Sequence, residues 1–135
     1  VTNHCNFFYM KQLPVPRPTE KDAAFRPIVE RAARLICTTP EFDDLAKEIV
    51  DEPSRLVQKK TKRDASSTFG VTDPAERTQL RAELDALVAQ LYDLTEEEFA
   101  YILTTFPLVD ESVKQLTLNT YRDLLRLGKL PETQL

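Results

Sequence analysis

The sequence predicts an all-α domain, a bundle of about five helices preceded by an extended, proline-rich N-terminal arm. Apolar residues recur at spacings of three and four through most of the chain, which is the period of amphipathic helices. Thr or Asp, followed by Pro or by acidic residues, precedes several of these stretches, as at helix starts. Only two glycines occur, Gly70 and Gly128, so a fold made of many tight hairpins is disfavoured.

The composition is that of one folded, soluble domain. The chain has 135 residues, 41% of them hydrophobic and 30% charged, which suffices for a real core. A net charge of -4 argues against a protein that is basic throughout, although it allows a local basic patch. No stretch approaches the roughly 20 apolar residues of a membrane span, and no signal segment opens the chain. Because the first residue is Val1, we expect a processed chain or a segment of a longer protein.

Residues 1–18 are expected to be extended. The run "NFFYM" is aromatic and apolar, and the prolines at 14, 16 and 18 force β or polyproline conformation on the residues before them. We interpret this arm as a strand followed by a stiff connector, the end of a sheet whose other strands lie elsewhere. Residues 19–135 form the helical domain in this interpretation.

Two helices are predicted before Pro53. Thr19 can cap the first, which reaches about Cys37 and either starts or bends at Pro27. The second opens at Thr39, followed by Pro at the first helical position. The expected apolar faces are Ile28, Ala32, Leu35 and Ile36 in the first helix, then Phe42, Leu45, Ala46 and Ile49 in the second. Residues 54–71 lack a pattern and are predicted to be a loop or a partly disordered linker.

Three further helices follow. The third helix is long, starts at Asp73-Pro74 and ends near Asp93. Thr95 and Glu98 form a capping box at the start of the fourth helix. The fifth helix begins near Asp110 and is closed by Gly128. Leu94 and Phe99 fit a hydrophobic staple, and Pro107 ends the fourth helix. The expected buried stripes are Leu80, Leu84, Leu87, Val88 and Leu91; Phe99, Ile102, Leu103 and Phe106; and Val113, Leu116, Tyr121, Leu124 and Leu125.

Residues suited to catalysis or metal binding are scarce. His4, Cys5 and Cys37 are the only His and Cys residues, too few for a four-ligand zinc site, and the lone His supports no Ser–His–acid triad. Two thiols 32 positions apart do not make a disulfide scaffold. No phosphate-binding glycine loop exists. The acidic run 96–98 is better explained as first-turn acids that stabilise a helix start than as catalytic carboxylates.

One basic cluster could contact a nucleic-acid backbone. It consists of Lys59, Lys60, Lys62 and Arg63, with Arg55 nearby, in the unpatterned segment. Such a run in a polar loop is commonly only solvated. The functional interpretation is nonspecific contact with DNA phosphates, which would position the protein without reading bases.

The order of motifs resembles a known family. "NFFYMKQLPVPRP", a helical region and "RAELDALVAQLYDLTEEEFAYILTTFPLVDE" together resemble the C-terminal end of adenine-specific DNA methyltransferases of the type IIG restriction–modification class. The matching positions are Asn6, Phe7, Phe8, Leu13, Pro14, Pro16 and Pro18, then Arg81, Glu83, Leu84, Asp85, Ala86, Leu91, Tyr92, Leu94, Ile102, Leu103, Phe106 and Pro107. The resemblance covers about half of the chain, and the segment between its two parts matches nothing in the family.

The resemblance implies that residues 1–18 are the end of a target-recognition region and that catalysis belongs to other domains of the parent protein. Family members bind S-adenosylmethionine through a glycine-containing loop and hold a flipped adenine with an Asn-Pro-Pro-Tyr motif. Neither occurs between Val1 and Leu135, so the cofactor and the catalytic residues would belong to upstream parts of a cytoplasmic parent protein. This chain would itself hold no cofactor, no metal and no catalytic residue, and would reach DNA through the parent.

The leading hypothesis is therefore a non-catalytic C-terminal helical domain of a DNA adenine methyltransferase or restriction–modification enzyme. It would support the upstream methyltransferase and target-recognition domains and contact the DNA backbone through the basic cluster, without any membrane contact. The alternative is a protein–protein interaction module, which predicts an exposed apolar patch on the bundle. A stand-alone small enzyme is disfavoured, since neither a nucleophile–base pair nor a cofactor loop is present.

Overall fold

The computed structural model describes residues 13–51 and 69–128. Within these ranges all regular secondary structure is helical, so the prediction of an all-α bundle of about five helices is confirmed there. The elements are α2 (Phe25–Ile36), the 3-10 turn η1 (Pro40–Phe42), α3 (Asp43–Asp51), α4 (Pro74–Leu91), α5 (Glu96–Thr104) and α6 (Glu111–Leu127). Residues 1–12 of the predicted arm lie outside the described ranges, and residues 14–18 have no regular structure and no strand.

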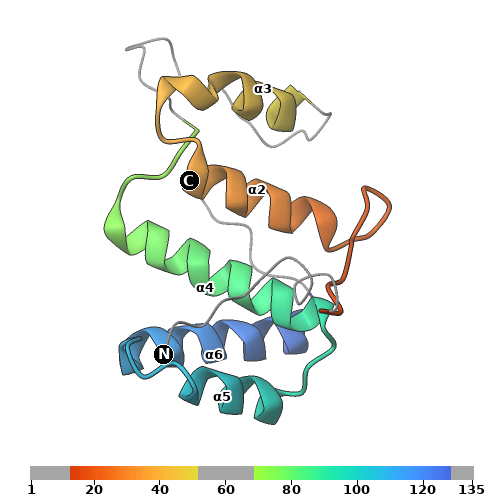
Figure 1. Cartoon of the computed structure of the whole chain (residues 1–135), viewed down its shortest axis with the longest axis vertical. Helices are drawn as coiled ribbons and strands as arrows, with labels where there is room; N and C mark the ends of the chain where they lie inside the picture. The colour runs from red at the N-terminus through yellow and green to blue at the C-terminus, as the bar shows by residue number, and fades with distance from the viewer. Residues whose placement is uncertain (1–12, 52–68, 129–135) are drawn as a thin grey trace.

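The helices are stacked across the long axis of the molecule in the spatial order α3, α2, α4, α6, α5 (Figure 1). The order along the chain differs, because α6 returns to lie between α4 and α5. Helix α4 is consequently central, with α2 on one side and α6 on the other, and its contact with α6 is the most extensive in the bundle. Only α2 and the turn η1 contact α3 extensively within the described residues.

Two starts were predicted for the first helix, and α2 begins at Phe25, so the start at Thr19 is wrong and the start near Pro27 is correct to within two residues. The Asp22 carboxylate instead accepts hydrogen bonds from the Thr19 backbone N–H at 2.6 Å and from its hydroxyl at 2.9 Å, which closes a separate turn. Pro27 explains the delay, since a proline ring excludes the helical carbonyl four residues earlier and is tolerated only in a first turn. The second helix follows the prediction: Thr39 precedes Pro40, and α3 ends before Pro53.

Helix α4 starts as predicted, with the Asp73 carboxylate accepting from the Glu76 backbone N–H at 2.9 Å. Its buried residues differ from the predicted stripe. Leu80 and Leu87 are buried, but Val88 is exposed. A second face is buried as well, made of Ala82, Glu83, Ala86 and Ala89. The central position of α4 requires two buried faces, and small side chains allow its neighbours to approach closely.

Helix α5 carries the predicted capping box. The Glu98 backbone N–H donates to the Thr95 hydroxyl at 3.2 Å, and the Thr95 backbone N–H donates to the Glu98 carboxylate at 2.8 Å. Leu94 packs against the core cluster that contains Phe99, as expected of a hydrophobic staple. The hydrogen bonds from the Thr95 backbone and hydroxyl hold the pKa of the Glu98 carboxyl below its usual value.

We expect Thr95→Ala to lower the free energy of unfolding by about 1 kcal/mol, because the N-cap acceptor is lost. The Glu98 contribution is fully present above the ordinary pKa that this carboxyl has in the unfolded chain, and it disappears as the pH falls through the lower folded-state pKa. Urea denaturation of wild type and Thr95→Ala at about pH 7 measures the first effect. The same measurement on wild type and Glu98→Gln at pH values from about 7 to 3 measures the second. Equal pH profiles for the two proteins would contradict the assignment.

The stripe predicted for α5 is only partly correct. Phe99 is buried and Leu103 packs against the core, but Ile102 and Phe106 are exposed. The helix end explains the exposure of Phe106: α5 stops at Thr104, so Phe106 lies beyond the helix and no longer follows its period. The prediction that Pro107 ends this helix was therefore about two residues late, within the usual uncertainty of helix ends.

Helix α6 completes the main core and ends as predicted, with Gly128 in the left-handed conformation at a φ of 69°. Tyr121 and Leu124 are buried, while Leu125 is exposed and Leu118, absent from the predicted stripe, is buried. The Tyr121 hydroxyl donates to the Leu94 carbonyl, and its ring meets Phe99 edge-on with centroids 4.9 Å apart. The main core thus joins α4, α5 and α6 around Tyr121.

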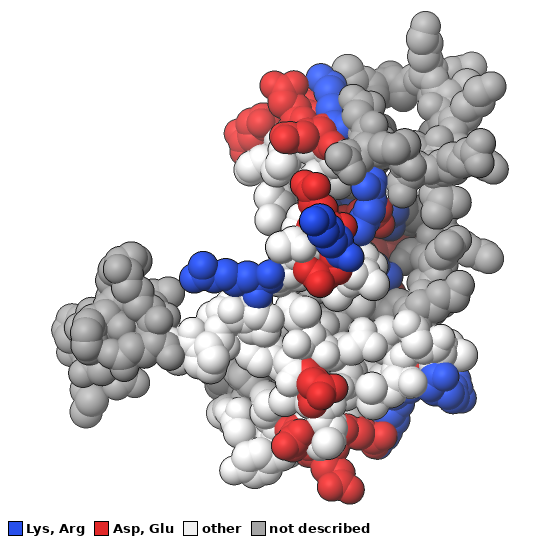
Figure 2. Space-filling view, turned by 90° about the vertical axis from the view of Figure 1, so that its right-hand side faces the viewer, with Lys and Arg blue, Asp and Glu red and all other residues white. Residues whose placement is uncertain are grey.

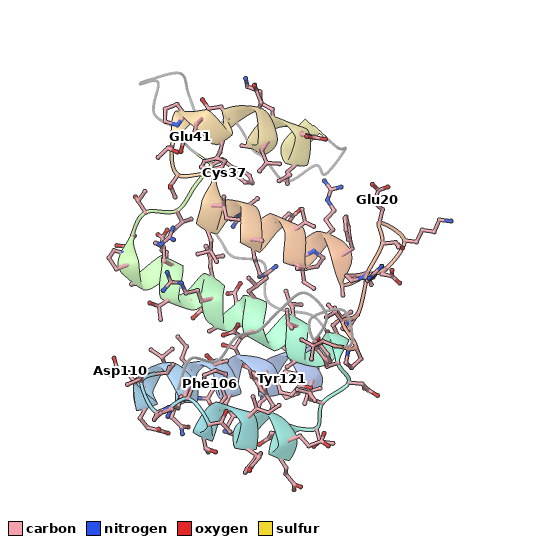
Figure 3. All side chains as sticks on the ribbon, in the orientation of Figure 1. Glu20, Cys37, Glu41, Phe106, Asp110 and Tyr121 are labelled. Atoms are coloured by element: carbon pink, nitrogen blue, oxygen red, sulfur yellow. The ribbon has the colours of Figure 1, made fainter. Side chains whose placement is uncertain are left out.

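A second, smaller core joins α2 and α3. It consists of Ala33, Cys37 and Ala46, with Phe42, Ile49 and Phe69 packed against it. Figure 3 shows Cys37 at the end of α2 that faces α3. Burial, with a smaller effect of the Asp43 carboxylate, raises the pKa of the Cys37 thiol. The thiol is therefore protonated at neutral pH and a poor nucleophile.

Candidate functional site

The basic cluster Lys59, Lys60, Lys62 and Arg63 lies outside the described residues, as do Arg55, His4 and Cys5. The structure therefore does not test the predicted DNA contact. Within residues 13–51 and 69–128, no group of His, Cys, Asp and Glu side chains could hold a metal ion. The structure describes the parts of the chain on either side of this segment, namely α3 and residues 69–73, and the charge of the helical bundle to which it is attached.

Residues 69–73, which follow the basic segment, form a junction that is hydrogen-bonded to the end of α2. The Val71 backbone N–H donates to the Arg34 carbonyl at 2.8 Å, which ties the junction to the end of α2. The Arg77 guanidinium donates to the carbonyls of Leu35 at 3.0 Å and Val71 at 2.7 Å. The Arg77 cation satisfies the Leu35 carbonyl, which lies in the last turn of α2, and it also suits the negative end of the helix dipole.

Gly70 is required at this junction for steric reasons. A Cβ atom at this position would lie 2.0 Å from the carbonyl oxygen of Cys37, which is backbone and cannot rotate away. Phe69 beside it packs into the smaller core. The segment that contains the basic cluster is therefore bounded by α3 on one side and by a closely packed junction on the other, so both attachments belong to the α2–α3 half of the bundle.

A buried ion pair holds α2 against the central helix. The Arg31 guanidinium donates to the Glu83 carboxylate at 2.7 Å, and the two side chains are only 12% and 5% exposed. The second carboxylate oxygen of Glu83 accepts from the Gln79 amide at 2.9 Å, and Arg31 also donates to the Pro27 carbonyl at 3.2 Å. Both charges are thus hydrogen-bonded, as buried charges must be. The arrangement is structural and offers no open position for a substrate.

The helical body is acidic. Residues 13–51 and 69–128 contain eleven Lys and Arg against nineteen Asp and Glu, whereas residues 52–68 contain five Lys and Arg against two acids. Figure 2 shows acidic side chains gathered at the lower end of one face, over the start of α5. There Glu96 pairs with Arg122 of α6 at 2.7 Å and Glu98 serves the capping box. These roles agree with the structural interpretation of the acidic run. The excess of acidic side chains makes the helical bundle a poor surface for DNA.

An exposed apolar corner lies at the connection between α5 and α6. We define the α5–α6 corner as Tyr101, Phe106, Leu108 and Val109. Tyr101 is 72% exposed, Phe106 is 52% exposed and Leu108 is 97% exposed. Sequence reasoning placed Phe106 in the core and did not single out Leu108. The signal that could have identified it is a leucine directly after Pro107, between two independently capped helices. An exposed apolar surface is what the hypothesis of an interaction module predicts.

The residues that carry the family resemblance in the second half of the chain lie on α4, on α5 and on the turns after them. Glu83 belongs to the buried ion pair, Ala86 to the main core and Leu94 to the staple. Tyr92 and Phe106 are exposed. These matched residues either build the bundle or present its surface, and among them no nucleophile lies beside a base in the described structure.

Comparison with known proteins adds no relative: no family model, no curated protein and no solved structure matches the chain. In the part of the chain that the structure describes, none of the helices combines the length and the hydrophobicity needed to cross a bilayer.

Proposed function

We propose that this chain is a non-catalytic helical domain from the C-terminal end of a DNA adenine methyltransferase or restriction–modification enzyme. The single observation that carries the proposal is the motif "RAELDALVAQLYDLTEEEFAYILTTFP" and its resemblance to that family. The motif spans α4 and α5, the helices to which α6 adds the last part of the main core. A scaffold role is consistent with the positions of its buried residues.

The family assignment has a direct test in the gene. Sequencing upstream of the codon for Val1 should find an Asn-Pro-Pro-Tyr motif preceded by a glycine-containing loop for S-adenosylmethionine. A target-recognition region should follow that motif and lead into the arm at residues 1–18. A reading frame with a start codon just before Val1 and neither motif would remove the methyltransferase assignment.

The proposed DNA contact uses the segment 52–68, where basic residues outnumber acids, rather than the acidic helices. Charge separation of this kind confines phosphate contacts to one part of the molecule and orients the remainder away from DNA. The role is one of positioning, because contacts to phosphates carry no sequence information directly. Recognition of the target sequence would belong to the upstream domains.

We expect the isolated chain to bind duplex DNA weakly and with a steep salt dependence. If the cluster makes about four phosphate contacts, the affinity should fall by roughly 100-fold between about 50 and 200 mM salt. Replacing Lys59, Lys60, Lys62 and Arg63 with Gln should abolish this binding in a fluorescence-anisotropy titration.

A matched control changes the same net charge elsewhere. Gln in place of Lys21, Lys47, Arg122 and Arg126 removes four cations that are exposed on the helical body. This variant should retain wild-type DNA affinity within about twofold, since an affinity set by contacts in the cluster does not depend on total charge alone. Equal losses in the two variants, or no binding at low salt, would remove the DNA contact from the proposal.

A further inference from the structure

The α5–α6 corner is apolar at a place where turns are ordinarily polar. The Val109 backbone N–H donates to the Phe106 carbonyl at 3.3 Å, which closes a turn with Pro107 and Leu108 at its centre. Proline suits the first central position of such a turn, but Asp, Asn, Ser or Gly usually occupy the exposed tip. Leu108 is 97% exposed there, and nothing in the local backbone geometry requires a leucine.

The two threonine hydroxyls at the end of α5 are hydrogen-bonded to carbonyls of their own helix. The hydroxyls of Thr104 and Thr105 donate to the carbonyls of Tyr101 and Ile102 at 2.6 and 2.7 Å. The Ile102 carbonyl also accepts from the Thr105 backbone N–H at 3.0 Å, so the end of α5 is closed by bonds within the helix itself. At roughly 200 Å² for a large side chain, the exposed fractions leave on the order of 400 Å² of apolar surface. This is the size of patch that is often functional in a monomeric protein.

Acidic residues border the corner along the chain on both sides. Glu97 lies one helical turn before Tyr101 on the outward face of α5, and Asp110 and Glu111 directly follow Val109. Figure 3 shows Phe106 and Asp110 at the end of the molecule where α5 gives way to α6. Within the described residues Glu97 and Asp110 form no ion pair, and Glu111 reaches Lys114 only at 3.7 Å. The rim is therefore negative and largely uncompensated.

The negative charge of the rim, formed by Glu97, Asp110 and Glu111, excludes some binding partners and favours others. DNA would be repelled by the acids. A second copy that docked through the same corner would bring the like-charged rims together, because a two-fold interface pairs each patch with itself. A polypeptide surface with apolar residues inside a border of Lys or Arg satisfies both the apolar centre and the negative rim.

We propose that the α5–α6 corner is a docking surface for a polypeptide whose exposed apolar face is bordered by Lys or Arg. This inference goes beyond the DNA-related function and does not depend on it. Tyr101, Phe106 and Leu108 supply the apolar contact, and Glu97, Asp110 and Glu111 select the charge of the partner. Affinity comes mainly from the apolar centre, whereas the rim confers selectivity and salt dependence.

The test uses the whole chain and two helical peptides with the same leucine face, one with Lys and one with Glu at all other positions. In NMR titrations the Leu/Lys peptide should shift resonances at the α5–α6 corner, and the Leu/Glu peptide should bind at least tenfold more weakly. Tyr101→Ser with Leu108→Ser should weaken the Leu/Lys peptide at least tenfold. Glu97→Gln with Asp110→Asn should weaken it at low salt and have little effect at high salt.

Leu13→Ser with Val15→Ser is the matched control, since it removes two exposed apolar side chains far along the chain from the corner. It should leave binding of the Leu/Lys peptide unchanged. All four substitutions to Ser are at exposed positions, so circular dichroism should show an intact fold. Equal binding of the two peptides, shifts located elsewhere, no binding of the Leu/Lys peptide, or a dimer that the corner variant abolishes would each overturn the proposal.

Discussion

Glu83→Ala is expected to lower the free energy of unfolding by about 3–5 kcal/mol. The substitution leaves the Arg31 guanidinium buried between α2 and α4 without the carboxylate that it contacts at 2.7 Å. The cost is that of an uncompensated buried charge, which exceeds the net stabilisation that the intact pair provides. Since small domains are stable by about 5–15 kcal/mol, this loss should be visible as a large shift of the urea midpoint.

The double variant Arg31→Met with Glu83→Leu is the control for this interpretation. Removing both charges and filling the space with apolar side chains should recover most of the loss, because neither charge then needs a partner. Recovery would show that the loss in Glu83→Ala comes mainly from leaving one buried charge without its partner. If the double variant is as unstable as Glu83→Ala although its volume is restored, the hydrogen-bonded ion pair itself stabilises the fold. A loss below about 1 kcal/mol in Glu83→Ala would show that the pair is exposed to solvent.

Phe99→Ala is expected to cost about 3–5 kcal/mol, the usual range for removing a buried aromatic side chain. Phe99 lies in the main core and meets the Tyr121 ring edge-on at 4.9 Å, so the substitution leaves a cavity and removes an aromatic contact. Chemical denaturation followed by circular dichroism measures the loss.

Tyr101→Ala is the matched control on the same helix. Tyr101 is an aromatic residue of α5 that faces solvent, and its removal should change stability by no more than about 0.5 kcal/mol. A comparable loss in the two variants would mean that the α5–α6 corner is already covered within the folded chain. That result would also contradict the docking surface proposed above.

Helix boundaries were predictable where the signal is local. The capping box of Thr95 and Glu98, the start at Asp73-Pro74 and the end at Gly128 each depend on residues within one turn of one another. Such signals report backbone hydrogen bonds that form without help from the remainder of the chain. Thr19 shows where this reasoning fails: its side chain does pair with Asp22, but Pro27 prevents a helix from following.

Burial was less predictable because it depends on neighbours that are distant in sequence. Periodicity identified the leucine face of α4, but nothing local indicates that Ala82, Glu83 and Ala86 are also buried. Glu83 is buried because α2 packs there, and its Arg31 partner lies 52 positions earlier, whereas Ala86 packs in the main core with residues of α5 and α6. A charged residue on a helix ordinarily indicates a solvent-facing side, so Glu83 was misleading without knowledge of its partner.

The candidate site also has parts that were visible in the sequence and parts that were not. The basic cluster is visible in the sequence because it is contiguous, and it stays a prediction, since it lies outside the described residues. The junction at Gly70 and Arg77 was not predicted. It forms from carbonyls at the end of α2, and a carbonyl has no sequence signature. The apolar corner was masked by the expectation that α5 continues to Phe106, which assigned an exposed residue to the core.

The separation of the two cores has a consequence for how the molecule opens. The main core draws on α4, α5 and α6, which are consecutive in the chain, whereas α3 contacts mainly α2 and η1 within the described residues. Contacts between neighbours in sequence form quickly, so the α4–α6 unit can fold first and serve as the template on which α2 docks. Helix α3, at the edge of the bundle, would then open locally while the remainder stays folded. Backbone amides of α3 should therefore exchange with deuterium well before those around Tyr121.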